Sequence, residues 1–170
     1  MPSKLLRGNA KISVVDYGAF ADPTHPTSAE LNSATLSFDI SCAVLDDYTL
    51  NLTDSDTDDT LTVCDIGNVQ SRTFTNYEGE LTGLRDADIT NSASVYNTFY
   101  HLFQAPDIKY WVVKRIGPSQ ATTYAAGQVI SMYGFTTDYP TNNADDGSML
   151  SMTANLKPTG DVNVNYTLVA

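Results

Sequence analysis

The sequence predicts a mainly β domain, arranged as a β-sandwich or partly open barrel with one flanking α-helix. Apolar and polar residues alternate with a period of two through most of the chain, which is typical of half-buried strands. Tyrosine outnumbers phenylalanine by ten to six and threonine recurs throughout, a composition that favours strands. One substantial segment, near residues 93–103, has the apolar spacing of a helix.

The first expected strands form a hairpin. Apolar residues occupy the even-numbered positions between Thr35 and Leu45, and alternation returns from Tyr48 to Thr53. The Asp46-Asp47 pair between them is typical of a turn. We therefore expect these two segments to pair with each other.

An acidic loop, Asp54 to Asp59, follows this hairpin, and a short strand is expected at residues 61–64. Between Asp46 and Asp65 there are seven acidic residues and no basic one. The spacing partly resembles a calcium-binding loop, but Asp59 stands where such a loop needs glycine. A solvated loop is the preferred interpretation, and no metal site is expected.

The next expected strand spans residues 71–85, and its alternation places four polar side chains on one face, those of Asn76, Glu78, Glu80 and Thr82. A helix over residues 93–103 follows, capped by Asn91 or Ser92. Its core-facing residues are expected to be Val95, Phe99, Leu102 and Phe103.

Four further strands complete the expected sheet. Their alternation places them at residues 109–116, 128–138, 148–157 and 161–169, the last two joined by a tight turn at Pro158 to Gly160. No linker, repeat or charge-segregated half divides the sequence. Residues 1–170 are therefore expected to form a single domain.

The charge is strongly acidic, at −11 overall. Three basic residues, Lys4, Arg7 and Lys11, lie in the N-terminal stretch, so residues 12–170 carry six basic against twenty acidic side chains, a net charge of −14. Nucleic acids have little electrostatic reason to adhere to such a surface. Many proteins are acidic for solubility alone, which remains an alternative interpretation.

No catalytic site is apparent. The two histidines, His25 and His101, lie in a proline-flanked loop and in the expected helix, and no nucleophile, phosphate-binding or metal-binding motif accompanies them. Cys42 and Cys64 are expected to be reduced thiols. We expect no cofactor, no metal and no enzymatic activity. The sequence also has no apolar run of signal-peptide or membrane-span length, so no membrane anchor is expected.

Several segments, in order, resemble the major tail proteins of bacteriophages with long, non-contractile tails. They are PTSAELN (26–32), CDIGNVQSRTFTNYEGELTGLRD (64–86), YHLFQAPD (100–107), TTYAAGQVIS (122–131) and the ending MTANLKPTGDVNVNYTLVA. The resemblance covers nearly all of the chain from Lys11 onward. It implies a tail-tube fold, hexameric rings stacked into a hollow tube, and passage of the genome through that tube.

The resemblance also implies partners and a location. Besides copies of itself, the chain is expected to meet tape measure, tail terminator and distal tail proteins, while DNA passes without specific binding. The expected location is the virion tail, after assembly in the cytoplasm of the host bacterium.

Three groups of residues are candidates for these roles. The face of Asn76, Glu78, Glu80 and Thr82 is the candidate lining of the bore, unless it simply faces outward to solvent. The segment from Asp46 to Asp65 is the candidate extension towards another subunit, or else a disordered surface loop, and its candidate contact residues are Asp46, Asp47, Asp54, Asp56, Asp58 and Asp59. The candidate contacts between rings are Lys4, Arg7 and Lys11. The alternative is a frayed N-terminus that makes no such contact.

Two other functions remain open from the sequence. One is a tube, hub or baseplate component of a contractile, secretion-type system with the same fold. The other is a carbohydrate-binding β-sandwich or an enzyme. For an enzyme, Glu78 and Glu80 lie on one face of a strand, as the carboxylate pair of a glycosidase might.

Overall fold

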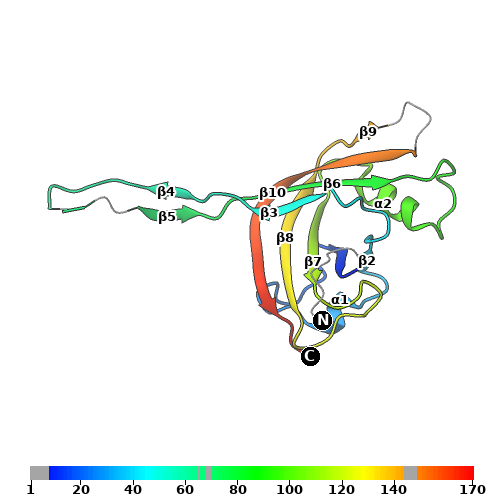
Figure 1. The fold of residues 1–170 in the computed structure, drawn as a ribbon, viewed down its shortest axis with the longest axis horizontal. Helices are drawn as coiled ribbons and strands as arrows, with labels where there is room; N and C mark the ends of the chain where they lie inside the picture. The colour runs from blue at the N-terminus through cyan, green and yellow to red at the C-terminus, as the bar shows by residue number, and fades with distance from the viewer. Residues whose placement is uncertain (1–7, 65, 68–69, 144–148) are drawn as a thin grey trace.

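The computed structural model describes residues 8–64, 66–67, 70–143 and 149–170 (Figure 1). Within these residues, eight strands form one open sheet in the order β2-β1-β7-β8-β10-β6-β3, with β9 also paired to β10. The strands of this sheet are β1 (Ala10–Asp16), β2 (Ser37–Asp39), β3 (Thr49–Leu52), β6 (Tyr77–Leu84), β7 (Lys109–Ile116), β8 (Val129–Thr137), β9 (Thr141–Asn143) and β10 (Ser151–Thr167).

The remaining elements are a two-stranded sheet and two helices. The small sheet pairs β4 (Asp56–Asp58) with β5 (Ser71–Phe74) and projects away from the rest of the molecule, which we call the body (Figure 1). The helices are α1 (Ser28–Leu31) and α2 (Val95–Phe103). The prediction of a mainly β fold with a flanking helix is confirmed.

Strand β10 joins two parts of the body sheet that run in different directions (Figure 1). Its first part, Ser151 to Leu156, pairs with β6, and its later part pairs with β8. The pairing with β8 is irregular between Pro158 and Val162, where β10 bulges and bends. The predicted C-terminal hairpin is therefore wrong, because one continuous strand replaces both of its expected strands.

The hydroxyl group of Tyr77 holds this bulge in place. It donates a hydrogen bond of 2.6 Å to the carbonyl of Gly134 and accepts bonds from the backbone amides of Thr159 and Gly160, at 3.1 and 3.0 Å. Gly160 has a φ of 98°, a conformation that glycine adopts readily. The Pro-Thr-Gly segment has the composition of a turn, but here it bends a strand without reversing it.

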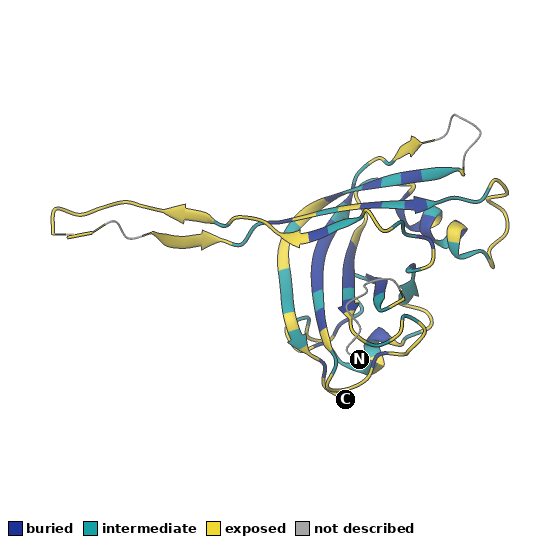
Figure 2. Cartoon of the chain, viewed as in Figure 1, coloured by how far each residue is buried: buried dark blue, intermediate teal, exposed yellow. Residues whose placement is uncertain are grey.

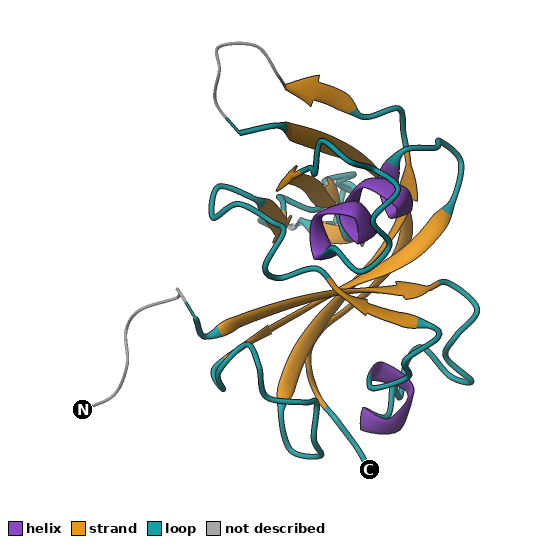
Figure 3. Cartoon of the chain, turned by 90° about the vertical axis from the view of Figure 1, so that its right-hand side faces the viewer, coloured by secondary structure: helices purple, strands orange, loops and turns teal. Residues whose placement is uncertain are grey.

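The core lies on both faces of β1, β7 and β8. Val112 and Phe135 belong to a cluster shared with β6, β10 and α2, whereas Val113 and Met132 belong to a second cluster on the opposite face. The second cluster also contains Leu31 of α1. Figure 3 shows the two helices at separate places on the body, with α1 close to the C-terminus.

Two glycines of β6 allow close packing beneath α2 and β8. A Cβ atom at Gly83 would overlap the ring of Phe99, and one at Gly79 would overlap the ring of Phe135. Phe99 is one of the helical residues expected to face the core, and it is fully buried. The predicted helix is confirmed, although it begins at Val95, two residues later than expected.

The predicted hairpin between residues 35–45 and 48–53 is wrong. Asp39 ends the short strand β2, because its carboxylate accepts bonds from the amide and hydroxyl of Ser41, at 3.0 and 2.5 Å. The chain then turns, and the carbonyl of Ile40 accepts from the amide of Ala43. Strand β3 pairs instead with β6.

Helix α1 is not among the predicted elements, although its sequence signal is clear. Thr27 and Glu30 form a capping box, in which the Thr27 side chain accepts from the Glu30 amide and the Glu30 carboxylate accepts from the Thr27 amide. Neither helix within the described residues has the length and apolar character needed to cross a membrane.

Candidate assembly surfaces

The projecting β4–β5 hairpin, which we call the arm, is the most exposed part of the structure. Every described residue from Asp56 to Phe74 is exposed (Figure 2). The sequence predicts an acidic loop at residues 54–59, but it does not predict that residues 71–74 form the second strand of the arm. The alternation of residues 71–74 continues into β6, so the sequence predicts one long strand there. The chain breaks that alternation at Thr75 and Asn76 and leaves β5 outside the body sheet.

Hydrogen bonds join the two sides of the arm at its base. The Asn76 side-chain amide donates to the carbonyl of Asp54 at 3.1 Å and to the carboxylate of Asp56 at 3.0 Å. The Thr73 hydroxyl donates to the Asp56 carbonyl at 3.0 Å. Farther out, hydrogen bonds from the hydroxyl and amide of Thr60 lower the pKa of Asp58. These hydrogen bonds are all made within the arm and its base.

The structure separates the acidic residues expected to form one extension. Asp54, Asp56, Asp58 and Asp59 lie along the outgoing side of the arm. Asp46 and Asp47 lie instead in a turn before β3, at the end of that strand away from the arm. The short strand expected at residues 61–64 is absent, and Asp65 lies outside the described residues.

The expected acidic face of β6 is present as a surface. Glu78 and Glu80 are exposed and Thr82 is half-buried, whereas Tyr77 and Leu81, which point the other way, are buried. Their neighbours on this surface are polar as well: Asn51 lies opposite Glu78, and Asn155 opposite Glu80. Asn76 differs from the others, because its amide is bound to the arm.

Of the three basic N-terminal candidates, Lys4 and Arg7 lie outside the described residues. Lys11 is buried within the body. Its ammonium group forms an ion pair with Asp39 at 3.1 Å, lies over the ring of Tyr124, and is 3.5 Å from the Thr122 carbonyl. Lys11 therefore has partners within its own chain, and a contact of these three residues with another ring stays a prediction.

A buried arginine next to Lys11 organises the loop between β7 and β8. Arg115 is fully buried, and its guanidinium donates to the carbonyls of Ser119, Thr122 and Thr123, at 2.8, 3.0 and 3.1 Å. Burial lowers the pKa of Arg115 and raises that of the adjacent Tyr124 to about 12. No sequence signal points to this site, because an arginine on an alternating strand is indistinguishable from a solvent-facing one.

The two histidines occupy local, exposed positions. His25 pairs with Asp22 at 2.8 Å in its own loop, and His101 on α2 lies 3.2 Å from the Ile89 carbonyl. Cys42 and Cys64 are exposed, free thiols. In the part of the chain that the structure describes, no group of three or more histidine, cysteine or acidic side chains could hold a metal ion.

Comparison with protein families decides how these surfaces are interpreted. The model of the phage tail tube protein family matches residues 1–170, which is the whole chain. The chain belongs to this family. No curated protein sequence matches it.

A phage tail tube protein is a structural component of the virion tail, and it assembles with copies of itself and with other tail proteins. The resemblance identified from the sequence is thereby confirmed. An exposed arm and an acidic strand face on an open sheet are surfaces that such a subunit can present to its neighbours.

Proposed function

We propose that this phage tail tube protein forms hexameric rings that stack into a hollow tube, through which the genome leaves the virion. Assembly takes place in the cytoplasm of the host bacterium, around a tape measure protein and between terminator and distal tail proteins. The observation that supports this most directly is the arm. It is a long extension that buries none of its described residues between Asp56 and Phe74 in its own chain.

An isolated two-stranded hairpin is marginally stable in water at best. A segment of this kind is therefore best suited to bind a neighbouring copy, where its side chains become buried. The acids Asp54, Asp56, Asp58 and Asp59 lie on this segment and would take part in that contact.

The open sheet supports closure of a ring. Its path ends in β2 on one side and β3 on the other, so both strands lack a neighbour on their outer side within the described chain. Such edges invite pairing with another chain. A repeated head-to-tail contact of two different edges closes into a ring when its rotation allows it.

Electron microscopy of the purified protein at increasing concentration tests the proposal. We expect rings at intermediate concentration and tubes at high concentration. Persistent monomers at all concentrations would contradict it, and isolated rings that never stack would favour a hub or baseplate role.

The polar face of β6 is our candidate for the bore lining. Glu78 and Glu80 repel phosphate groups, and carboxylates do not retain DNA by counterion release. A bore of this kind lets DNA slide. Asn76, just before β6, and Thr82, near its C-terminal end, would complete the lining.

Charge reversal tests the bore assignment. Glu78→Lys with Glu80→Lys should leave tubes intact but slow DNA ejection from the virion, at least about tenfold at low salt. The matched control, Asp46→Lys with Asp47→Lys, makes the same change of charge in the turn before β3. Equal ejection rates for the two double variants would show that Glu78 and Glu80 face elsewhere.

A further inference from the structure

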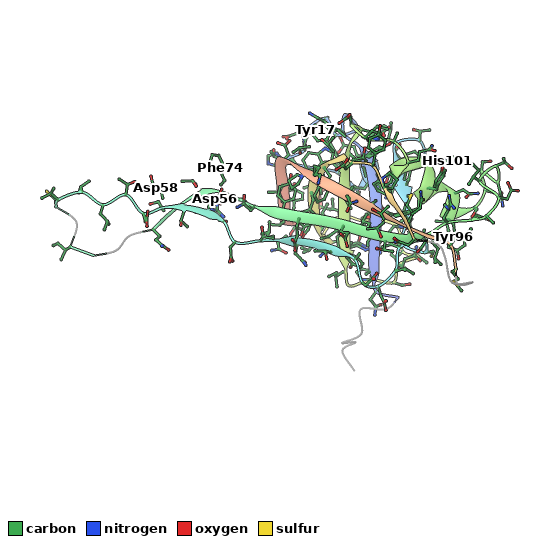
Figure 4. All side chains as sticks on the ribbon, turned by 90° about the horizontal axis from the view of Figure 1, so that it is seen from above. Tyr17, Asp56, Asp58, Phe74, Tyr96 and His101 are labelled. Atoms are coloured by element: carbon green, nitrogen blue, oxygen red, sulfur yellow. The ribbon has the colours of Figure 1, made fainter. Side chains whose placement is uncertain are left out.

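Exposed apolar side chains occur at several places on the surface, and two groups of them lie at opposite ends of the molecule. Leu61, Val63 and Ile66 lie at the far end of the arm and are all exposed. Tyr96 and Met149 are exposed at the end of the body that points away from the arm. Figure 4 shows this separation, with Tyr96 at one end and Asp58 of the arm at the other.

The body end contains an apolar pocket of about 430 Å³. Its walls come from the last residue of β6, the first turn of α2 and the segment before β10, and its apolar lining includes Leu84, Tyr96, Met149 and Leu150. A pocket of this kind can accommodate apolar side chains of a partner.

The arm tip cannot reach the pocket of its own chain. The arm leaves the body beside Tyr77, at the start of β6, whereas Leu84 at the end of β6 forms a wall of the pocket. At a rise of about 3.3 Å per residue, the segment from Leu52 to Val63 extends up to about 36 Å in the opposite direction. A contact between tip and pocket must therefore join two copies head to tail.

The polar groups of the pocket are compatible with this occupant. The guanidinium of Arg85 lies over the ring of Tyr100, and its buried Nε atom has no hydrogen-bond partner. Asp86 on the pocket wall balances the charge of Arg85, so apolar burial and not net attraction determines the fit.

We propose that this pocket binds the arm tip of a second copy, with Val63 and its apolar neighbours seated against Tyr96 and Met149. The inference rests on the proposed self-assembly into rings and tubes, and it adds the acceptor surface. It also explains why a chain with an acidic surface keeps uncharged side chains exposed at the end of its arm.

Disulfide cross-linking tests the contact. In a Cys42→Ser, Cys64→Ser background, Val63→Cys with Met149→Cys should give oligomer ladders under mild oxidation of assembled protein. The control pairs Val63→Cys with Tyr139→Cys, because Tyr139 is 71% exposed and Met149 is 74% exposed. A ladder that ends at the ring size places the contact within a ring, and one that continues places it between rings.

Charge insertion supplies a second test, in protein that keeps both Cys42 and Cys64. Val63→Glu and Met149→Glu should each raise the concentration needed for assembly at least about tenfold, since a buried apolar contact of this size is worth about one decade of affinity. Tyr139→Glu should leave that concentration unchanged. Monomer folding is checked by circular dichroism in each case.

The outcomes separate this inference from the proposed function. If the parent protein forms rings or tubes but the thiol introduced by Val63→Cys fails to cross-link, or links equally to positions 139 and 149, the pocket assignment is overturned and the function stands. Normal assembly of Met149→Glu would also overturn it. If the parent protein never assembles, both the function and the inference fail.

Discussion

The body and the arm of this chain derive their structure from different sources. In the body, buried side chains meet each other across both faces of the sheet, and the buried Arg115 has four hydrogen bonds to groups of its own chain. In the arm, all described residues from Asp56 to Phe74 are exposed. Hydrophobic burial drives folding, so the stability of the monomer comes from the body, and the arm contributes little to it.

This difference has a thermodynamic consequence. Changes in the body should alter the free energy of unfolding of the monomer, whereas changes in the arm should alter assembly and leave that free energy nearly constant. The following predictions test the separation, beginning with the largest effect on unfolding.

Arg115→Ala should lower the free energy of unfolding by about 4 kcal/mol, because it creates a cavity and removes the donors for three loop carbonyls. Urea denaturation of the monomer measures this. Lys109→Ala on the same strand is the control, since Lys109 is exposed and should change stability by less than about 0.5 kcal/mol. Similar values for the two variants would show that the buried network contributes little.

Gly79→Ala should lower the free energy of unfolding by about 3 kcal/mol, at the upper end of the cost of overpacking. The added methyl group would overlap the ring of Phe135 on β8. Gly18→Ala is the matched control, because nothing lies within 4 Å of a Cβ atom at that position. A neutral Gly79→Ala would mean that β6 and β8 are less tightly packed than the structure shows.

Tyr77→Phe should cost about 2 kcal/mol, because the amides of Thr159 and Gly160 lose their shared acceptor. The ring remains, so the packing against Phe135 is preserved and the variant isolates the hydroxyl group. Tyr139→Phe, at an exposed position, should have no measurable effect on thermal unfolding. Equal melting temperatures for the two variants would show that the Tyr77 hydroxyl does not stabilise the bend in β10.

Local patterns in the sequence predict the elements whose structure is decided locally. The strand at Lys109–Ile116 has the expected bounds, and α2 buries Phe99, Leu102 and Phe103 as its spacing requires. The alternation of β6 likewise separates its buried and exposed faces correctly.

Pairing partners could not be predicted, because they depend on contacts far away in the sequence. Local alternation pairs residues 48–53 with the preceding segment, but β3 pairs with β6. The segment Pro158 to Gly160 has the composition of a turn. In the structure it forms a bulge, because the amides of Thr159 and Gly160 donate to the Tyr77 hydroxyl. For the candidate sites, the sequence locates the acidic face and one side of the arm, but it assigns residues 71–74 to the body, and it does not predict the pocket at Tyr96 and Met149.

Removal of the arm should have the smallest effect on monomer stability and the clearest effect on assembly. Thr53 and Asn76 are joined by a backbone hydrogen bond of 2.9 Å, so an Asn-Gly turn can replace residues 54–75 between them. The free energy of unfolding should then change by less than about 0.5 kcal/mol, since none of the described residues from Asp56 to Phe74 is buried. Sedimentation velocity should show a monomer at concentrations where the parent protein forms rings or tubes. A loss of stability comparable to that of Tyr77→Phe would mean that the arm folds together with the body. Unimpaired assembly would mean that other surfaces, such as the sheet edges at β2 and β3, hold the rings and tubes together without the arm.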